Sequence, residues 1–271
     1  VNSQVGDKVT IKILCDVNEE LTKDYEWTKD VLITTDNQDG VTVDLGFRYE
    51  RDLWCLLDDA HMMTIDDGVT ILGLGQLLAG WGDVESVVDV DGDVTAQQLW
   101  AFCGTANVNP TATVVLGYGD GMMKISDGGV VNVAGKLEEG AAATLDYATA
   151  VPQVNAGYVQ SYHYYWDCYN RLNLTDTFMK TTCIVSPRND SLLVSLDNSV
   201  IYLNETGAPM IGWTTEANSK LDLVNGSRII CEATMTFDGE MSIEIGSQIK
   251  AKGFINKGSL DVYVEGLAEP V

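Results

Sequence analysis

The chain of 271 residues is poor in basic side chains, with 16 lysine and arginine residues against 40 aspartate and glutamate residues. The formal net charge is -24 at pH 7, and a surface of that charge is repelled by phosphate backbones and anionic lipid headgroups. Nucleic-acid binding is therefore excluded as an expected role. The deficit is uneven, because no lysine or arginine lies between Arg51 and Lys124.

Histidine and long apolar runs are also scarce. His61 and His163 are the two histidines, and neither lies in a nucleophile motif, so we expect no catalytic residues and no enzyme activity. No segment reaches the roughly 18 consecutive apolar residues of a membrane span. The start at Val1, without an apolar signal core, predicts an extracellular or cell-surface chain whose signal peptide has been removed.

Short β-branched runs separated by Gly-containing turns dominate what the chain does contain. Residues 31–34 and 41–43 flank Asp39-Gly40, and the same arrangement recurs at least seven times, which is typical of β-hairpins. Acids and apolar side chains alternate over residues 261–264, as in a half-buried antiparallel strand. The sequence predicts an all-β fold of antiparallel, hairpin-rich sheets, either sandwich-like or extended.

Helix is expected only as a minor element, over residues 50–63 and 95–102. No repeat of fixed period is visible, so a solenoid or a propeller is not expected. The composition changes over residues 141–155, which form a candidate linker. It would separate an acidic β region, 1–140, from an aromatic, sequon-bearing β region, 156–271, and one continuous domain is the alternative.

Six separated cysteines form an even set without a CxxC pair, so zinc is not expected. In an acidic chain they favour a framework of at least two disulfides, within or between chains, and an oxidising compartment. Six independent buried thiols are the alternative. The disulfide candidates are Cys15, Cys55, Cys103, Cys168, Cys183 and Cys231.

Four Asn-X-Ser/Thr sequons all lie in the second half, whereas a fifth triplet is blocked by Pro110. The candidates for N-glycosylation are Asn173, Asn189, Asn204 and Asn225. Covalent glycans are therefore expected on this half of the chain and not on the part that precedes Asn173.

Three acids, Asp89, Asp91 and Asp93, occupy the first, third and fifth positions of an apparent calcium loop. The loop fails afterwards, because Val94 replaces the required glycine and Trp100 replaces the bidentate glutamate. A turn is the favoured interpretation. The three aspartates remain weak candidates for a structural calcium ion, and no other cofactor is expected.

The densest aromatic cluster contains Tyr162, Tyr164, Tyr165 and Trp166. In a β protein such side chains most often pack in the core or across strands. Their large rigid area also suits them to sugar stacking or to an assembly interface.

In overall character the chain resembles archaeal surface-layer proteins, especially the proteinaceous cell-sheath subunits of filamentous methanogens. The similarity rests on the start at Val1, the six separated cysteines, the four sequons and the Asx-Gly turns. It implies amyloid-like β assembly into hoops or tubes, with disulfide reinforcement and glycosylation.

We therefore expect a secreted structural protein that self-assembles through β-strand edges into a sheath, surface layer or filament. Its partners would be further copies of itself and other cell-surface components. Residues 113–117 and 130–133 contain neither proline nor a charged side chain, and are the expected unprotected edges. The alternatives are a carbohydrate-binding or adhesive β-sandwich module and a viral capsid or spike protein of jelly-roll type.

Overall fold

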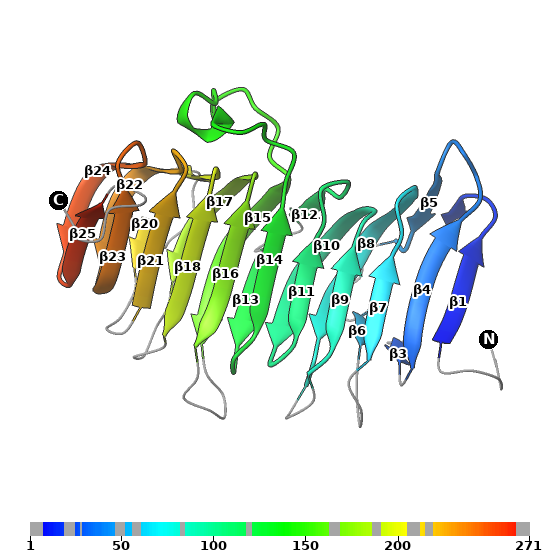
Figure 1. The fold of residues 1–271 in the computed structure, drawn as a ribbon. Coiled ribbons are helices and arrows are strands. Elements are labelled where there is room, and N and C mark those ends of the chain that lie inside the picture. Colours follow the sequence, from blue (N-terminus) through cyan, green and yellow to red (C-terminus); the bar gives the residue numbers. More distant parts are fainter. Residues whose placement is uncertain are drawn as a thin grey trace.

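The computed structural model describes residues 8–18, 25–27, 29–46, 52–55, 61–81, 85–117, 121–162, 169–185, 191–204, 212–214 and 219–263. In these ranges the chain forms 25 strands and one short 3-10 helix, η1 (Ala141–Ala143). The strands belong to two sheets, and every pairing between them is parallel. The chain passes alternately through the two sheets and so winds as a β-solenoid (Figure 1).

Sheet A contains eleven strands in the described ranges, and their spatial order follows the order of the chain. They are β1 (Lys8–Ile13), β4 (Asp30–Thr35), β7 (Met62–Ile65), β9 (Val87–Val90), β11 (Thr105–Val108), β14 (Val130–Ala134), β16 (Asn170–Thr175), β18 (Leu192–Asp197), β21 (Ser219–Val224), β23 (Gly239–Glu244) and β25 (Ser259–Tyr263). The two termini consequently lie at opposite ends of the row (Figure 1).

Sheet B contains the other fourteen described strands. They are β2 (Val17–Asn18), β3 (Tyr25–Trp27), β5 (Val41–Asp44), β6 (Asp52–Cys55), β8 (Val69–Ala79), β10 (Asp93–Phe102), β12 (Val114–Leu116), β13 (Met122–Ser126), β15 (Val154–Tyr162), β17 (Phe178–Val185), β19 (Val200–Leu203), β20 (Gly212–Thr214), β22 (Arg228–Phe237) and β24 (Gln248–Asn256). A long strand such as β8 pairs along its length with two short ones, β5 and β6.

The core lies between the two sheets and is built from columns of apolar residues, one residue from each coil. One column of sheet A consists of Val9, Val31, Met63, Val88, Ala106, Val131, Leu172, Val194, Leu221, Met241 and Leu260. Each strand in the middle of sheet A has one face on this core and the other toward solvent. For this reason apolar and polar residues alternate here, although most parallel sheets are buried on both faces.

The prediction of antiparallel hairpins is wrong. Asp67-Gly68, for example, joins β7 of sheet A to β8 of sheet B, and the other six predicted hairpins also connect strands of different sheets. An Asx-Gly turn reverses the local chain direction, but it does not specify which strand the next run will pair with. Parallel pairing also overturns the antiparallel sandwich and jelly-roll architectures that we considered.

Glycine at these corners permits the turn conformation and also allows neighbouring coils to approach closely. Gly128, between β13 and β14, has φ of +87°, a conformation that favours glycine. A Cβ atom on the adjacent Gly129 would lie 2.1 Å from the carbonyl oxygen of Ala101, in the preceding coil. The turn signal in the sequence therefore also marks a close approach between neighbouring coils.

The expectation that the chain would not form a solenoid is also wrong. The sequence shows no fixed repeat because the coils differ in length. Two neighbouring strands of sheet A begin at Val87 and Thr105, whereas another neighbouring pair begins much further apart in the sequence, at Val130 and Asn170. The longest coil contains the excursion 135–153, which stands out from the body (Figure 1). Within it, Leu145 and Tyr147 pack with Phe178 on the outer face of sheet B.

Several finer predictions can be placed on this architecture. Residues 95–102, predicted as a helix, lie in β10, and the described parts of 50–63 are strand residues apart from His61. The expected edges also lie inside the sheets, because β12 and β14 each have a partner strand on both sides. Residues 141–155 hold η1 and the start of β15, and the division of the chain at this segment stays a prediction. In the described part of the chain no helix is long and apolar enough to cross a membrane.

Candidate functional site

A ladder of amide side chains runs across the solvent-facing side of sheet A. Asn107 Nδ2 donates to Asp89 Oδ1 at 2.6 Å, and Asn132 Nδ2 donates to Asn107 Oδ1 at 2.8 Å. Asn173 Nδ2 donates in turn to Asn132 Oδ1 at 2.8 Å. The ionised carboxylate of Asp89 can only accept, so it sets the direction in which all three amides donate. We call these four residues the asparagine ladder.

The ladder follows from register, because these residues occupy equivalent positions in β9, β11, β14 and β16. The same column continues through Ser195, Asp222, Ser242 and Asp261. In the sequence each member sits between two apolar residues, as in Val131-Asn132-Val133. Recurrence of this apolar-Asx-apolar triplet is the signal that sequence reasoning missed.

Amides and carboxylates also pair at the corners where the chain leaves sheet A. The pairs are Asn109 Nδ2 to Asp91 Oδ1 (2.8 Å), Asn198 Nδ2 to Asp176 Oδ1 (2.7 Å) and Asn225 Nδ2 to Asp197 Oδ1 (2.7 Å). Asp176, Asn198 and Asn225 have φ of 50°, 42° and 53°, a left-handed conformation that Asx residues tolerate better than most. These corners therefore place carboxylates of the acidic chain beside amide donors of the neighbouring coil.

The three calcium candidates each accept a hydrogen bond, and the fold distributes them around one corner. Asp89 belongs to the asparagine ladder, Asp91 lies at the corner, and Asp93 begins β10 and accepts from the backbone N–H of Thr113 at 2.8 Å. Within the described ranges, no three His, Cys, Asp or Glu side chains gather in a way that could hold a metal ion. Calcium binding stays a prediction.

The predicted glycosylation sites lie in unequal surroundings. Asn173 is half-buried in the asparagine ladder, Asn225 is exposed at a corner, and Asn204 is half-buried just after β19. Asn189 lies outside the described residues. An N-linked glycan is carried by Nδ2, the atom that Asn173 uses as its ladder donor, so glycosylation there would compete with the ladder.

The described cysteines lend no support to a disulfide framework. Cys15 is exposed, Cys103 is half-buried, Cys183 and Cys231 are buried, and Cys15, Cys183 and Cys231 are free thiols. Burial raises the pKa of Cys183 to about 11 and also raises the pKa of Cys231, so these two thiols are protonated and poorly reactive at neutral pH. The side chain of Cys55 and all of Cys168 lie outside the description.

Of the predicted aromatic residues, the structure places Tyr162, while Tyr164, Tyr165 and Trp166 lie outside the described ranges. Tyr162 ends β15, and its ring centroid is 6.3 Å from that of Trp100. The predicted cluster is therefore described only at its first residue, where the aromatic ring packs against another ring.

A second aromatic cluster was missed by the sequence analysis. The ring of Trp81 stacks on Phe102 at 5.0 Å and meets Trp100 edge-on at 5.8 Å. The Lys124 ammonium lies 4.8 Å from the centre of the Trp100 ring. Trp100 and Phe102 alternate in β10 with residues of the main core, so they lie on the outer face of sheet B.

The C-terminal end of the solenoid presents apolar side chains to solvent. Phe254 and Ile255 of β24 are 45% and 50% exposed, and Leu260 and Val262 of β25 are 46% and 39% exposed. Leu260 is the last member of a core column that is buried in the middle of the solenoid. Among the described strands, β25 pairs only with β23 and β24 pairs only with β22, so each has an unpaired edge.

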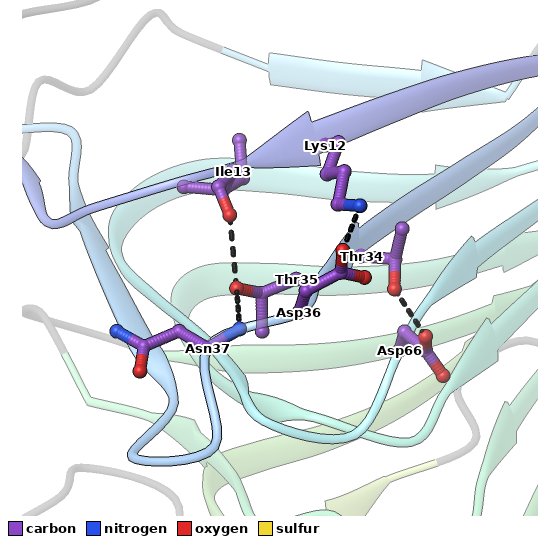
Figure 2. Close-up of polar contacts among 7 residues, drawn as sticks. All are labelled: Lys12, Ile13, Thr34, Thr35, Asp36, Asn37 and Asp66. Atoms are coloured by element: carbon purple, nitrogen blue, oxygen red, sulfur yellow. Dashed lines mark hydrogen bonds and ion pairs between the residues drawn. The ribbon is translucent and has the colours of Figure 1, made fainter.

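At the N-terminal end, the edge strand β1 is joined to the next coil by side-chain contacts (Figure 2). Lys12 forms an ion pair with Asp36, and Thr35 Oγ1 donates to the carbonyl oxygen of Ile13 at 2.8 Å. Among the described strands β1 pairs only with β4, so its outer edge is unpaired as well. Within the residues that the structure describes, the solenoid therefore has two open ends, which differ chemically.

Comparison with known proteins supplies no relative from which a role could be carried over. No family model, no curated protein and no solved structure matches the chain.

Proposed function

We propose that this chain is an extracellular structural protein that self-assembles through the β-strand edges of its solenoid ends into a filament, sheath or surface layer. The observation that carries the proposal is the C-terminal end of the described solenoid, where β24 and β25 have edges without a described partner strand and expose apolar side chains. Soluble proteins usually blunt such edges, because they pair readily with other chains. The two edges also face along the solenoid axis, where a further coil would stack.

The apolar side chains supply a favourable free energy for this assembly. Phe254, Ile255, Leu260 and Val262 are each about half exposed, and covering the exposed half contributes about 1 kcal/mol per side chain, or about 4 kcal/mol in total. Hydrogen bonds between strand edges add to this. The net charge of -24 opposes association, but salt screens it over a Debye length of about 8 Å at physiological ionic strength.

Sedimentation velocity and electron microscopy over a range of protein and salt concentrations test the proposal. We expect polymers that grow with both concentrations. Leu260→Lys should suppress them, because the lysine would be trapped at the junction between copies. The matched control is Val151→Lys, since Val151 is 86% exposed but lies in the excursion, away from both ends. A wild-type chain that remains a monomer throughout would contradict the proposal.

A second candidate function is carbohydrate binding at the missed aromatic cluster. It is favoured by Trp81, which is 36% exposed and lies over Phe102, because exposed indole rings stack well on sugar faces. A glycan-binding screen with wild type and Trp81→Ala tests it. Binding that is lost in the variant would support this role, and no binding by the wild type would remove it.

A further inference from the structure

We infer that the occupant of each open end is a second copy docked head to tail, with β25 of one copy paired in parallel with β1 of the next. In this junction Leu260 lies beside Val9 of the next copy, and Val262 lies beside its Ile11. The inference rests on the proposed self-assembly and adds its polarity and its register.

The register follows from the core columns, which run through the solenoid from one end to the other. The column of Val9 ends at Leu260, and the neighbouring column consists of Ile11, Ile33, Ile65, Val90, Val108, Val133, Leu174, Leu196, Leu223, Ile243 and Val262. Every strand of sheet A thus offers apolar residues at the same two positions. A second copy in the same register extends both columns by one further coil and covers Leu260 and Val262.

Sheet B has a comparable column of ten residues, one fewer than each column of sheet A: Val17, Val43, Ile71, Val94, Val114, Val154, Met179, Ile201, Ile229 and Ile249. When β25 pairs with β1 of the next copy, β24 and β2 of that copy are therefore two strand spacings, about 9.6 Å, apart. The register of the junction accordingly rests on sheet A.

The charges of the two ends are complementary on sheet A. In sheet A, β1 contains two lysines and no acid, whereas β25 contains Asp261 and no base. The shared register places Asp261 beside Thr10 of the next copy, between positions 8 and 12, which are the two lysines. Lys12 is exposed, and its ion pair with Asp36 keeps it on the outer face of the edge strand.

Head-to-tail docking thus opposes unlike charges on sheet A, whereas two N-terminal ends facing each other would oppose the lysines of one β1 to those of the other.

Because the two ends differ, this contact is heterologous and produces an open filament. Eleven strands of sheet A spaced about 4.8 Å apart give an axial repeat of about 53 Å per copy.

Cysteine cross-linking tests the register. One chain carries Thr10→Cys and a second carries Asp261→Cys, both in a Cys15→Ser background that removes the thiol exposed among the described cysteines. In the inferred register the two Cα atoms lie about 4.8 Å apart, within disulfide range. The control pairs Thr10→Cys with Ser259→Cys, where the two-residue offset gives about 8 Å, beyond that range. The Asp261→Cys substitution also removes a charge that attracts the lysines of β1. This loss can only lower cross-linking of the matched pair, so it cannot produce the expected difference.

We expect the matched pair to form at least tenfold more cross-linked dimer than the offset pair, and Asp261→Cys alone to form little. Electron micrographs of wild-type filaments should show the repeat of about 53 Å. If the wild type assembles but the offset pair or Asp261→Cys alone cross-links equally well, the head-to-tail register is overturned while self-assembly stands. If the wild type never assembles, the proposed function itself fails.

Discussion

Asn132 occupies the middle of the asparagine ladder, so its truncation should have a measurable effect on stability. Asn132→Ala removes the hydrogen bond that Asn132 donates to Asn107 and the one that it accepts from Asn173. A typical intramolecular hydrogen bond contributes about 1 kcal/mol net, so we expect the free energy of unfolding to fall by about 2 kcal/mol. Alanine and asparagine are both poor strand formers, and propensity should therefore add little.

The change should appear as a lower melting temperature. For a chain of this size, about 2 kcal/mol corresponds to a decrease of about 5 °C, measured by circular dichroism on dilute protein. The matched control is Ser195→Ala. Ser195 lies in the same column of sheet A and is half-buried, but its side chain makes no hydrogen bond with the described residues. We expect its melting temperature to change by less than about 1 °C.

Equal melting temperatures for the two alanine variants would refute the reasoning. That result would mean that the amides bond equally well to water, and that the ladder is a consequence of register without a contribution to stability. A loss of β-sheet signal in Asn132→Ala at low temperature would also contradict it, because truncation on the solvent side should leave the core intact.

Two further predictions concern the corners and the core. Gly129→Ala should lower the free energy of unfolding by about 2–3 kcal/mol in urea titrations, because its Cβ would overlap the Ala101 carbonyl oxygen. The control Gly117→Ala, whose nearest neighbour is a flexible side-chain atom at 3.4 Å, should change it by less than about 0.5 kcal/mol, and equal effects would contradict the close-approach argument. Burial raises the pKa of Cys183 from 9.0 to about 11, so the folded state favours the neutral thiol. The burial of this neutral thiol contributes its full stabilisation of the folded state below pH 9, and that contribution is lost as the pH rises toward 11. The melting temperature should therefore fall more between pH 8 and pH 10.5 in the wild type than in Cys183→Ala, and identical falls would show that this thiol does not contribute.

The sequence pattern predicted the positions of the strands better than it predicted which strands pair with each other. Alternation such as that of Val31 and Ile33 with polar neighbours depends on having one buried face, and that condition is the same in a sandwich and in a solenoid. The Asx-Gly corners were correctly identified as sharp turns. Their partners were not, because pairing depends on residues a whole coil away, and the unequal lengths of the coils hide the repeat.

The candidate surfaces were predictable to different degrees. Exposed apolar residues such as Leu260 look the same in the sequence as their buried counterparts, since only their place in the last described strands exposes them. The asparagine ladder, in contrast, has a local signal in triplets such as Leu172-Asn173-Leu174. That signal acquires meaning only when register aligns the triplets, because an amide ladder needs strands stacked with equivalent positions side by side.

The unequal coils show that strand register and the length of the connections vary independently in this fold. Strand register is held constant by the core columns, while the excursion 135–153 shows that a connection can lengthen without disturbing either sheet. Each added coil extends the molecule by a fixed step of about 4.8 Å, whatever its number of residues. The axial length of the molecule therefore depends on the number of coils, and the length of the surface connections can vary without changing it.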